Sequence, residues 1–232
     1  MKTYTEHIFE ELVQDNSTEA KLRRYLERRR REHEEREKNR PRPESKNELQ
    51  DMIIAAIEKN GPEADLNYID TSEIEDMSNL FNSYHDGVDE NKDKLLQSFN
   101  GDISDWDVSS VDNMNCMFYN ADYFNQNISD WDVSSVEDMS YMFYNATSFN
   151  QNISGWKVGS VSSMYSMFYN AENFNQNISG WDVGSAWNMT CMFNGATSFN
   201  QDLSGWDVTG KYTEDMFNEC PIEDKNKPKG LE

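Results

Sequence analysis

Apolar side chains recur at one fixed interval along more than half of the chain. Tryptophan, phenylalanine and methionine each return every 25 residues, at Trp106, Trp131, Trp156, Trp181 and Trp206, at Phe99, Phe124, Phe149, Phe174 and Phe199, and at Met117, Met142, Met167 and Met192. A fixed period of about 20–50 residues is typical of arrays in which each unit buries its apolar face only against its neighbours. The pattern therefore predicts a stack of units with these side chains in its core.

Two shorter periods lie within each unit. From Ile153 to Val158 the end of the segment alternates between apolar and polar residues, which is typical of a strand. From Val161 to Ala171 the apolar positions fall on one face of a short helix of about two turns. Asn and Gln in the connecting loop, residues 148–152, suit ladders of side-chain amides between units. We therefore expect an α/β fold, a right-handed leucine-rich-repeat-like solenoid of about six turns.

The ends of the repeat region are irregular, as terminal units of such arrays usually are. A degenerate first unit begins at Ile69, and its distance to Trp106 exceeds the period by 12 residues, which indicates an insertion. The last unit is one residue short and ends at Phe217. The predicted organisation is a charged helical arm at 1–38, a linker at 39–47, a capping helix with its lead-in at 48–68, repeats at 69–217 with the insertion at 82–98, and a tail at 218–232.

The capping helix is predicted by one apolar stripe and a clear stop signal. Leu49, Met52, Ile53, Ala56 and Ile57 share one helical face, and a Gly-Pro pair follows at 61–62. The linker before it holds two prolines and no apolar residue.

The repeats follow the pattern W-D-V-S-x-V-x-x-M-x-x-M-F-x-x-A-x-x-F-N-Q-x-I-S from Trp106 to Ser204. In this pattern the chain resembles the BspA-like leucine-rich-repeat family of bacterial surface proteins, whose repeats also occur in mycoplasma lipoproteins. The spacing I-x-x-W-x-V is similar to the L-x-x-L-x-L of leucine-rich repeats. The resemblance implies an α/β solenoid and a role in surface adhesion or protein binding.

Charge divides the chain into two parts. The net charge is −22, yet residues 1–50 hold 13 basic and 12 acidic residues, whereas residues 51–232 hold 8 and 31. An acidic array disfavours nucleic acid and anionic membranes as partners. Solubility alone would also account for this charge.

The arm predicts helices that associate with other helices. Arg28 and Glu32, like Glu27 and Arg31, are spaced four apart, so their pairing supports a lone helix. A solvated helix and an RNA-binding helix are the alternatives, but RNA binding requires an excess of positive charge that the arm lacks. The apolar patch at Ile8, Phe9, Leu12 and Val13 therefore favours a homo-oligomer formed through the arm.

No catalytic motif occurs in the array. The histidines, His7, His33 and His85, lie outside the five full units, and the chain has no zinc, P-loop or dinucleotide motif. We therefore expect no enzyme activity and no cofactor.

One weak metal candidate lies in the insertion. Asp89, Asn91 and Asp93 match positions 1, 3 and 5 of a calcium loop, but Lys94 replaces the required glycine and Asn100 replaces the bidentate glutamate. A solvated loop is the favoured interpretation of this segment.

The cysteines and the N-terminus bear on the compartment. Cys116 and Cys191 hold the same position three units apart, about 14 Å at strand spacing, whereas a disulfide needs Cα atoms within about 7 Å. With Cys220 left over, free thiols and a reducing compartment are expected. The chain shows no secretory signal and no membrane-length apolar run, so we expect a cytoplasmic protein, or a cell-surface protein if a signal was removed.

One column of charged residues is predicted to point outward between the Trp and Val of each strand. Its members are Asp107, Asp132, Lys157, Asp182 and Asp207. Like charges side by side are unfavourable, so each Asp either bonds the local backbone or contributes to a face that docks a basic partner.

These observations favour a non-enzymatic protein-interaction module that binds a basic protein. An inhibitor of a host protein, encoded by a phage or a mobile element, would fit this class. The alternative is an exported bacterial surface adhesin or structural repeat protein.

Overall fold

The computed structural model describes residues 23–28, 30–31, 38–82 and 90–231. The chain divides into two compact units, Met1–Pro41 and Arg42–Glu232. In the first unit, residues 23–28, 30–31 and 38 are helical, and the predicted apolar patch of the arm lies outside the described residues. The second unit contains the repeats.

The predicted capping helix is confirmed as α3, Lys46–Asn60. It begins there because the Ser45 side chain accepts a hydrogen bond from the Glu48 N–H, and the Glu48 carboxylate in turn accepts one from the Glu44 N–H. It ends at Gly61, whose φ of 86° suits glycine and whose N–H donates to the Ile57 carbonyl. Its buried face joins the core of the repeats through Leu49, Ile53, Ile54, Ala56 and Ile57.

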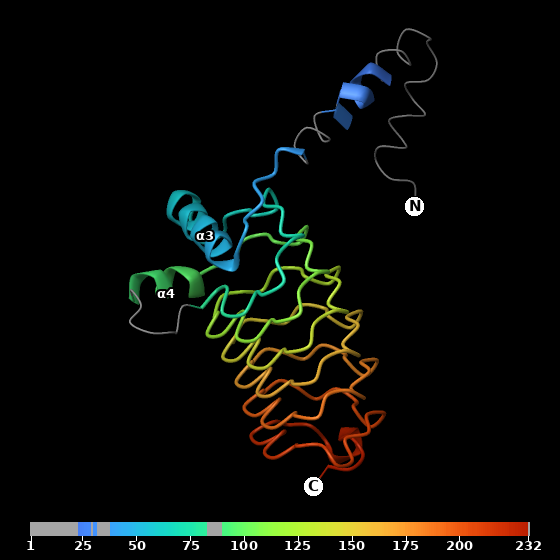
Figure 1. The fold of residues 1–232 in the computed structure, drawn as a ribbon. Helices are drawn as coiled ribbons and strands as arrows, with labels where there is room; N and C mark the ends of the chain where they lie inside the picture. The colour runs from blue at the N-terminus through green and yellow to red at the C-terminus, as the bar shows by residue number, and fades with distance from the viewer. Residues whose placement is uncertain (1–22, 29, 32–37, 83–89, 232) are drawn as a thin grey trace, which may run out of the picture. The chain divides into compact units, whose positions relative to one another are not determined.

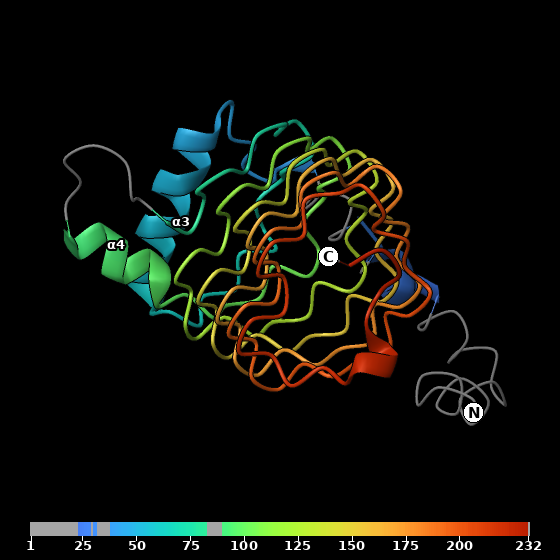
Figure 2. The same cartoon turned by 90° about the horizontal axis from the view of Figure 1, so that it is seen from below.

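The insertion contains a helix where a solvated loop was expected. This helix, α4, spans Glu90–Gln97, buries Leu96 completely and lies beside α3 (Figures 1 and 2). The burial of Leu96 explains why the segment orders, because the side chain joins the same core as the neighbouring α3. No helix in the described part of the chain is long and apolar enough to cross a membrane.

The repeats form coils that lie on one another (Figure 1), and they superimpose in the view along the stack (Figure 2). One isolated parallel bridge joins each coil to the next, through Asp76, Asn113, Asp138, Ser163, Asn188 and Tyr212 in order. The 37-residue interval from Asp76 to Asn113 contains the insertion, and the interval from Asn188 to Tyr212 is one residue short of 25. The two irregular ends predicted from sequence therefore match the register of the coils.

The helix predicted within each unit is wrong, and so is the strand. Residues 161–171 form turns, in which Ser166 and Asn170 have positive φ values of 51° and 52° that a right-handed helix cannot contain. Backbone N–H groups at alternate residues donate to the next coil instead, as from Met164 to the Asn188 carbonyl at 2.9 Å. The apolar spacing resembled a helix because these tight turns also bring every third or fourth side chain inward.

The core consists of aromatic columns. Trp106 and Trp131 stack with ring centroids 6.5 Å apart and planes 2° from parallel, and two phenylalanine columns interdigitate, as Phe143 and Phe149 do at 3.9 Å. All five repeating tryptophans are at most 4 % exposed, which confirms that this column is inside. The three cysteines are free thiols.

Polar ladders run beside the aromatic columns and confirm the predicted role of Asn and Gln. Asn125 Oδ1 accepts from the Asn150 N–H and from Gln151 Nε2 of the following coil, at 3.0 and 2.9 Å. A second ladder joins Asn145 Nδ2 to Asn120 Oδ1 at 2.8 Å. These amides satisfy backbone groups at turns that would otherwise lack partners.

Candidate binding face of the repeat array

The predicted charged column lies on the surface, and it begins one coil earlier than expected. Asp107, Asp132, Lys157, Asp182 and Asp207 are exposed, and each stands between a buried Trp and a buried Val. Asp70 holds the same position in the first coil, after the buried Ile69. We refer to Asp70, Asp107, Asp132, Asp182 and Asp207 as the acidic column, which Lys157 interrupts.

Each aspartate of the acidic column closes a local turn. Oδ1 accepts a hydrogen bond from the backbone N–H two residues further on, at distances of 2.9–3.1 Å: Ser72 for Asp70, Ser109 for Asp107, Ser134 for Asp132, Gly184 for Asp182 and Thr209 for Asp207. Local backbone bonding, one of the two interpretations of these residues, is therefore present. It does not exclude the other, because these bonds use Oδ1 and leave Oδ2 for a further donor.

Hydrogen bonds favour the ionised form of Asp132 and Asp207. The side chain and the N–H of Ser134, with Lys157 nearby, hold the pKa of Asp132 below its ordinary value. The side chain and the N–H of Thr209 do the same for the pKa of Asp207. Both carboxylates are therefore charged at neutral pH and can attract cations.

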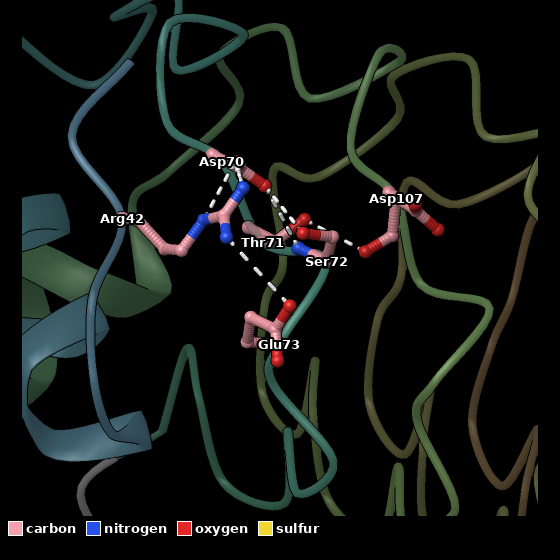
Figure 3. Close-up of polar contacts among 6 residues, drawn as sticks. All are labelled: Arg42, Asp70, Thr71, Ser72, Glu73 and Asp107. Carbon is pink, nitrogen blue, oxygen red and sulfur yellow. Dashed lines mark hydrogen bonds and ion pairs between the residues drawn. The ribbon is translucent and has the colours of Figure 1, made fainter. Parts of the chain in front are cut away.

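The first position of the acidic column is already occupied by a guanidinium group (Figure 3). Arg42 Nε and Nη2 donate to Asp70 Oδ2 at 2.9 and 2.5 Å, and Arg42 Nη1 lies 3.7 Å from Glu73 Oε1. Burial acts to raise the pKa of Asp70, but hydrogen bonds from Ser72 and Arg42 outweigh it and hold the pKa below its ordinary value. Thr71 Oγ1 donates to the Asp107 carbonyl at 2.8 Å, which joins this site to the next coil.

A lysine occupies a second acidic position on the same coil. Lys46 Nζ lies 2.7 Å from Asp76 Oδ2 and donates to Ser78 Oγ at 2.8 Å. The basic residues of the short segment before and at the start of α3 thus contact the first coil from Asp70 to Asp76. Both contacts are made within the chain, between basic side chains and carboxylates of the first coil.

The C-terminal coils carry an exposed aromatic pair. Trp187 is 52 % and Tyr212 65 % exposed, and their rings meet edge to face with centroids 5.6 Å apart. They are the last two members of a row of equivalent positions, in which the backbone N–H of each residue donates to the carbonyl of the residue before it in the row. The row consists of Glu75, Asp112, Glu137, Ser162, Trp187 and Tyr212. The row is thus polar in its first coils and aromatic in its last two.

No metal site is found on this face. In the described part of the chain no group of three or more His, Cys, Asp or Glu side chains could hold a metal ion. Asn91 and Asp93 of the weak calcium pattern lie within α4, where residues two apart point to different sides, and Asp89 lies outside the described residues.

Four of the surface residues described above were not predicted from the sequence: Arg42, Asp70, Trp187 and Tyr212. Asp70 could have been found, because it follows Ile69, which aligns with the repeating tryptophans. Trp187 could have been noticed as an aromatic residue at a position that is acidic or serine in the preceding units. Nothing in the sequence pairs Arg42 with Asp70.

The coils stack with aromatic columns inside and charged columns outside, and these features define the chain as an acidic repeat protein. The chain belongs to the family described as "Mycoplasma protein of unknown function, DUF285", whose family model matches residues 47–171 and 152–227. The match covers α3 except its first residue and the coils from Asp76 to Tyr212. Comparison with curated proteins and with solved structures found no match.

Proposed function

We propose that the repeat array is a protein-binding module and that its acidic column docks a basic protein. The observation that carries the proposal is the Arg42 guanidinium on Asp70, because it is a basic group bound at one member of a repeated position. A stack of coils presents such positions as one regular surface, and repeat arrays commonly bind partners through surfaces of this kind. Within its family we place the chain with the BspA-like leucine-rich-repeat proteins, as a right-handed solenoid without enzyme activity.

Charge on this face should act mainly on the rate of encounter with the partner. Binding should therefore weaken as salt rises, because the Debye length falls to about 10 Å at 0.1 M salt. We place the protein in the cytoplasm. A pull-down with the full chain from a cytoplasmic extract would capture the partner.

The test replaces the four exposed carboxylates of the acidic column by Asn, at Asp107, Asp132, Asp182 and Asp207. Asn keeps an Oδ1 acceptor for the local turns and removes the charge, so the fold should persist while capture of the basic partner at low salt falls. A matched control removes four charges elsewhere in the array, at Asp102, Asp122, Glu172 and Asp202. Asp202 is a close match, because its Oδ1 closes the same kind of turn with Ser204. Equal capture by both variants and the wild type would refute the proposal.

A further inference from the structure

We propose that the last coil is a docking edge, on which a basic segment of a partner protein adds one more layer to the stack. The inference goes beyond the acidic column, because it concerns the end of the array and rests on backbone donors. It starts from the way in which an inner coil holds the next one. N–H groups at alternate residues donate to carbonyls of the following coil at 2.8–3.0 Å, from Ser166, Phe168 and Asn170 to Thr190, Met192 and Asn194.

The last coil keeps the backbone geometry that directs these donors. Asp215 and Glu219 have φ values of 53° and 55°, as Ser166 and Asn170 have 51° and 52°. The coil also accepts the N–H groups of the coil before it in the same register, at the carbonyls of Glu214, Met216 and Asn218. Its own outward donors have no hydrogen-bond acceptor among the described residues, and they are the N–H groups of Asp215, Phe217 and Glu219. A row of unpaired donors at an edge is a template for pairing with another chain.

A phenylalanine column ends at the same place. Phe217 stacks on Phe193 with ring centroids 5.5 Å apart and planes 2° from parallel. Phe193 is completely buried, whereas Phe217 is only partly buried, because no further coil covers its outer side. In the inner coils the residue after the middle acceptor supplies the covering ring, as Phe193 does after Met192. The partner segment therefore needs an aromatic side chain between its acceptor carbonyls.

The C-terminal tail covers another part of the last coil. The N–H groups of Leu203 and Val208 donate to the carbonyls of Asn226 and Lys229, and the Lys229 N–H donates to the Trp206 carbonyl. No backbone hydrogen bond of the described tail residues 221–231 reaches residues 212–219. The tail thus extends the stack beside the tryptophan column and leaves the donor edge unpaired.

A second copy of the array does not fit this edge. The matching carbonyl edge belongs to the first coil, at the opposite end of the stack beside α3 (Figure 1). There Gln50 Nε2 of α3 donates to the Leu80 carbonyl at 3.0 Å, so the helix covers that edge. Two donor edges placed against each other would supply no acceptor.

Charge also indicates a different partner. Glu214, Asp215 and Glu219 are exposed, and none of them forms an ion pair with a described residue. Residues 51–232 hold 8 basic and 31 acidic residues, so a second array would be repelled. A segment with lysine or arginine beside its aromatic residue would be attracted.

Two synthetic peptides, each titrated into the full chain, test the edge. The first copies residues 137–147, which hold the acceptor carbonyls and the ring of an inner coil, and carries two added lysines at each end. The second has the same composition in scrambled order. Fluorescence anisotropy should give a dissociation constant at least about tenfold lower for the copied peptide, the range expected from two or three added hydrogen bonds. Amide hydrogen exchange at Asp215, Phe217 and Glu219 should slow with the copied peptide alone.

Two variants separate the ring from the charges. Phe217→Ala should weaken binding of the copied peptide, and so should the double variant Asp215→Asn, Glu219→Asn at low salt. Asn suits the positive φ of Glu219, because Asn145 and Asn170 hold the equivalent position in inner coils. The matched control Glu172→Gln, Asp202→Asn removes two exposed charges elsewhere and should bind as the wild type does.

Three results would overturn the proposal. They are equal binding of the two peptides, protection that appears in other coils instead of the last one, and slow exchange of the three amides in the free chain. At moderate salt the four-Asn variant of the acidic column should bind the copied peptide as the wild type does. That result would support an edge site separate from the acidic column, whereas loss of binding in that variant would overturn it.

Discussion

At the scale of single residues, four of the five repeating tryptophans bury their indole N–H with a partner. In Trp156 the ring stacks on Trp181 of the next coil, and the indole Nε1 donates to the Ile128 carbonyl of the preceding coil at 3.0 Å. The second contact satisfies a polar group that burial would otherwise leave without a partner. The same donor repeats in Trp106, Trp131 and Trp181. Trp206, in the last coil, buries its Nε1 without a hydrogen-bond partner among the described residues.

Replacing Trp156 by Ala should lower the free energy of unfolding by about 3–5 kcal/mol, the usual cost of removing a large buried aromatic side chain. Urea unfolding followed by circular dichroism measures this loss. Replacing Trp187, which is 52 % exposed, by Ala serves as the control and should cost less than about 1 kcal/mol. Similar losses for the two variants would contradict the assignment of Trp156 to the core.

Acid should destabilise the array through its turn aspartates. Hydrogen bonds hold the pKa values of Asp102, Asp132, Asp202 and Asp207 below their ordinary values in the folded chain. The unfolded chain therefore binds more protons, and stability falls as the pH drops below about 4, the ordinary pKa of aspartate. Urea midpoints measured from neutral pH to about pH 3 should fall in the wild type and fall less in a variant with Asn at these four positions. An identical acid response in both proteins would contradict this account.

At the scale of elements, the turns take the place of the helices that the apolar spacing predicted. The neighbouring coil fixes their backbone. Positive φ at Tyr141 and Asn145 directs alternate N–H groups toward carbonyls of the next coil. The shortened last unit shows the same dependence. There Lys211 Nζ donates to the carbonyls of Val183, Gly184 and Ala186 at 3.0, 2.7 and 2.8 Å.

Replacing Lys211 by Met should keep the apolar stem and remove the three hydrogen bonds. The free energy of unfolding should fall by about 1–2 kcal/mol, because the carbonyls are only partly buried and water can replace the ammonium group at some of them. Hydrogen exchange should show the loss in the last two coils and leave the coils around Asn113 and Asp138 unchanged. Replacing Lys229, another lysine of the last coil, by Met is the matched control. Uniform loss of protection in all coils would contradict a local role for Lys211.

At the scale of the whole molecule, the repeats and α3 share one continuous core, whereas the first 41 residues form a separate compact unit. The junction falls beside Arg42, whose guanidinium group is paired with the first coil. Arg42 should therefore contribute to the stability of the array, and the residues before it should not.

A chain that starts at Arg42 should unfold at nearly the same urea concentration as the full chain, because α3, its Ser45 cap and the Arg42 contact are all retained. We also expect it to sediment as a monomer, since the apolar patch predicted to drive self-association lies in the arm. A matched chain that starts at Lys46 lacks Arg42 and the α3 cap, and it should unfold about 1–2 kcal/mol more easily. A large loss of stability in the first chain would assign the arm to the core.

The sequence by itself determined the period, the register and the inside of the stack. Tryptophan, phenylalanine and methionine columns are visible in one chain because each unit must bury the same face against its neighbour. The insertion before Trp106 and the short last unit follow from the same count. The exposed position of Asp107 and its counterparts follows too, because the residue between a buried Trp and a buried Val points outward.

Only the tertiary structure decided how the backbone passes through each coil and what the first aspartate binds. The spacing of Val161, Met164 and Ala171 is compatible with a helix, and turns form instead because the next coil supplies carbonyl acceptors that no single unit contains. The pairing of Arg42 with Asp70 joins residues far apart in the chain, through a linker without apolar pattern. The spacing of apolar residues along the chain indicates which face of a unit is buried. The hydrogen-bond partners between coils exist only once the coils have stacked.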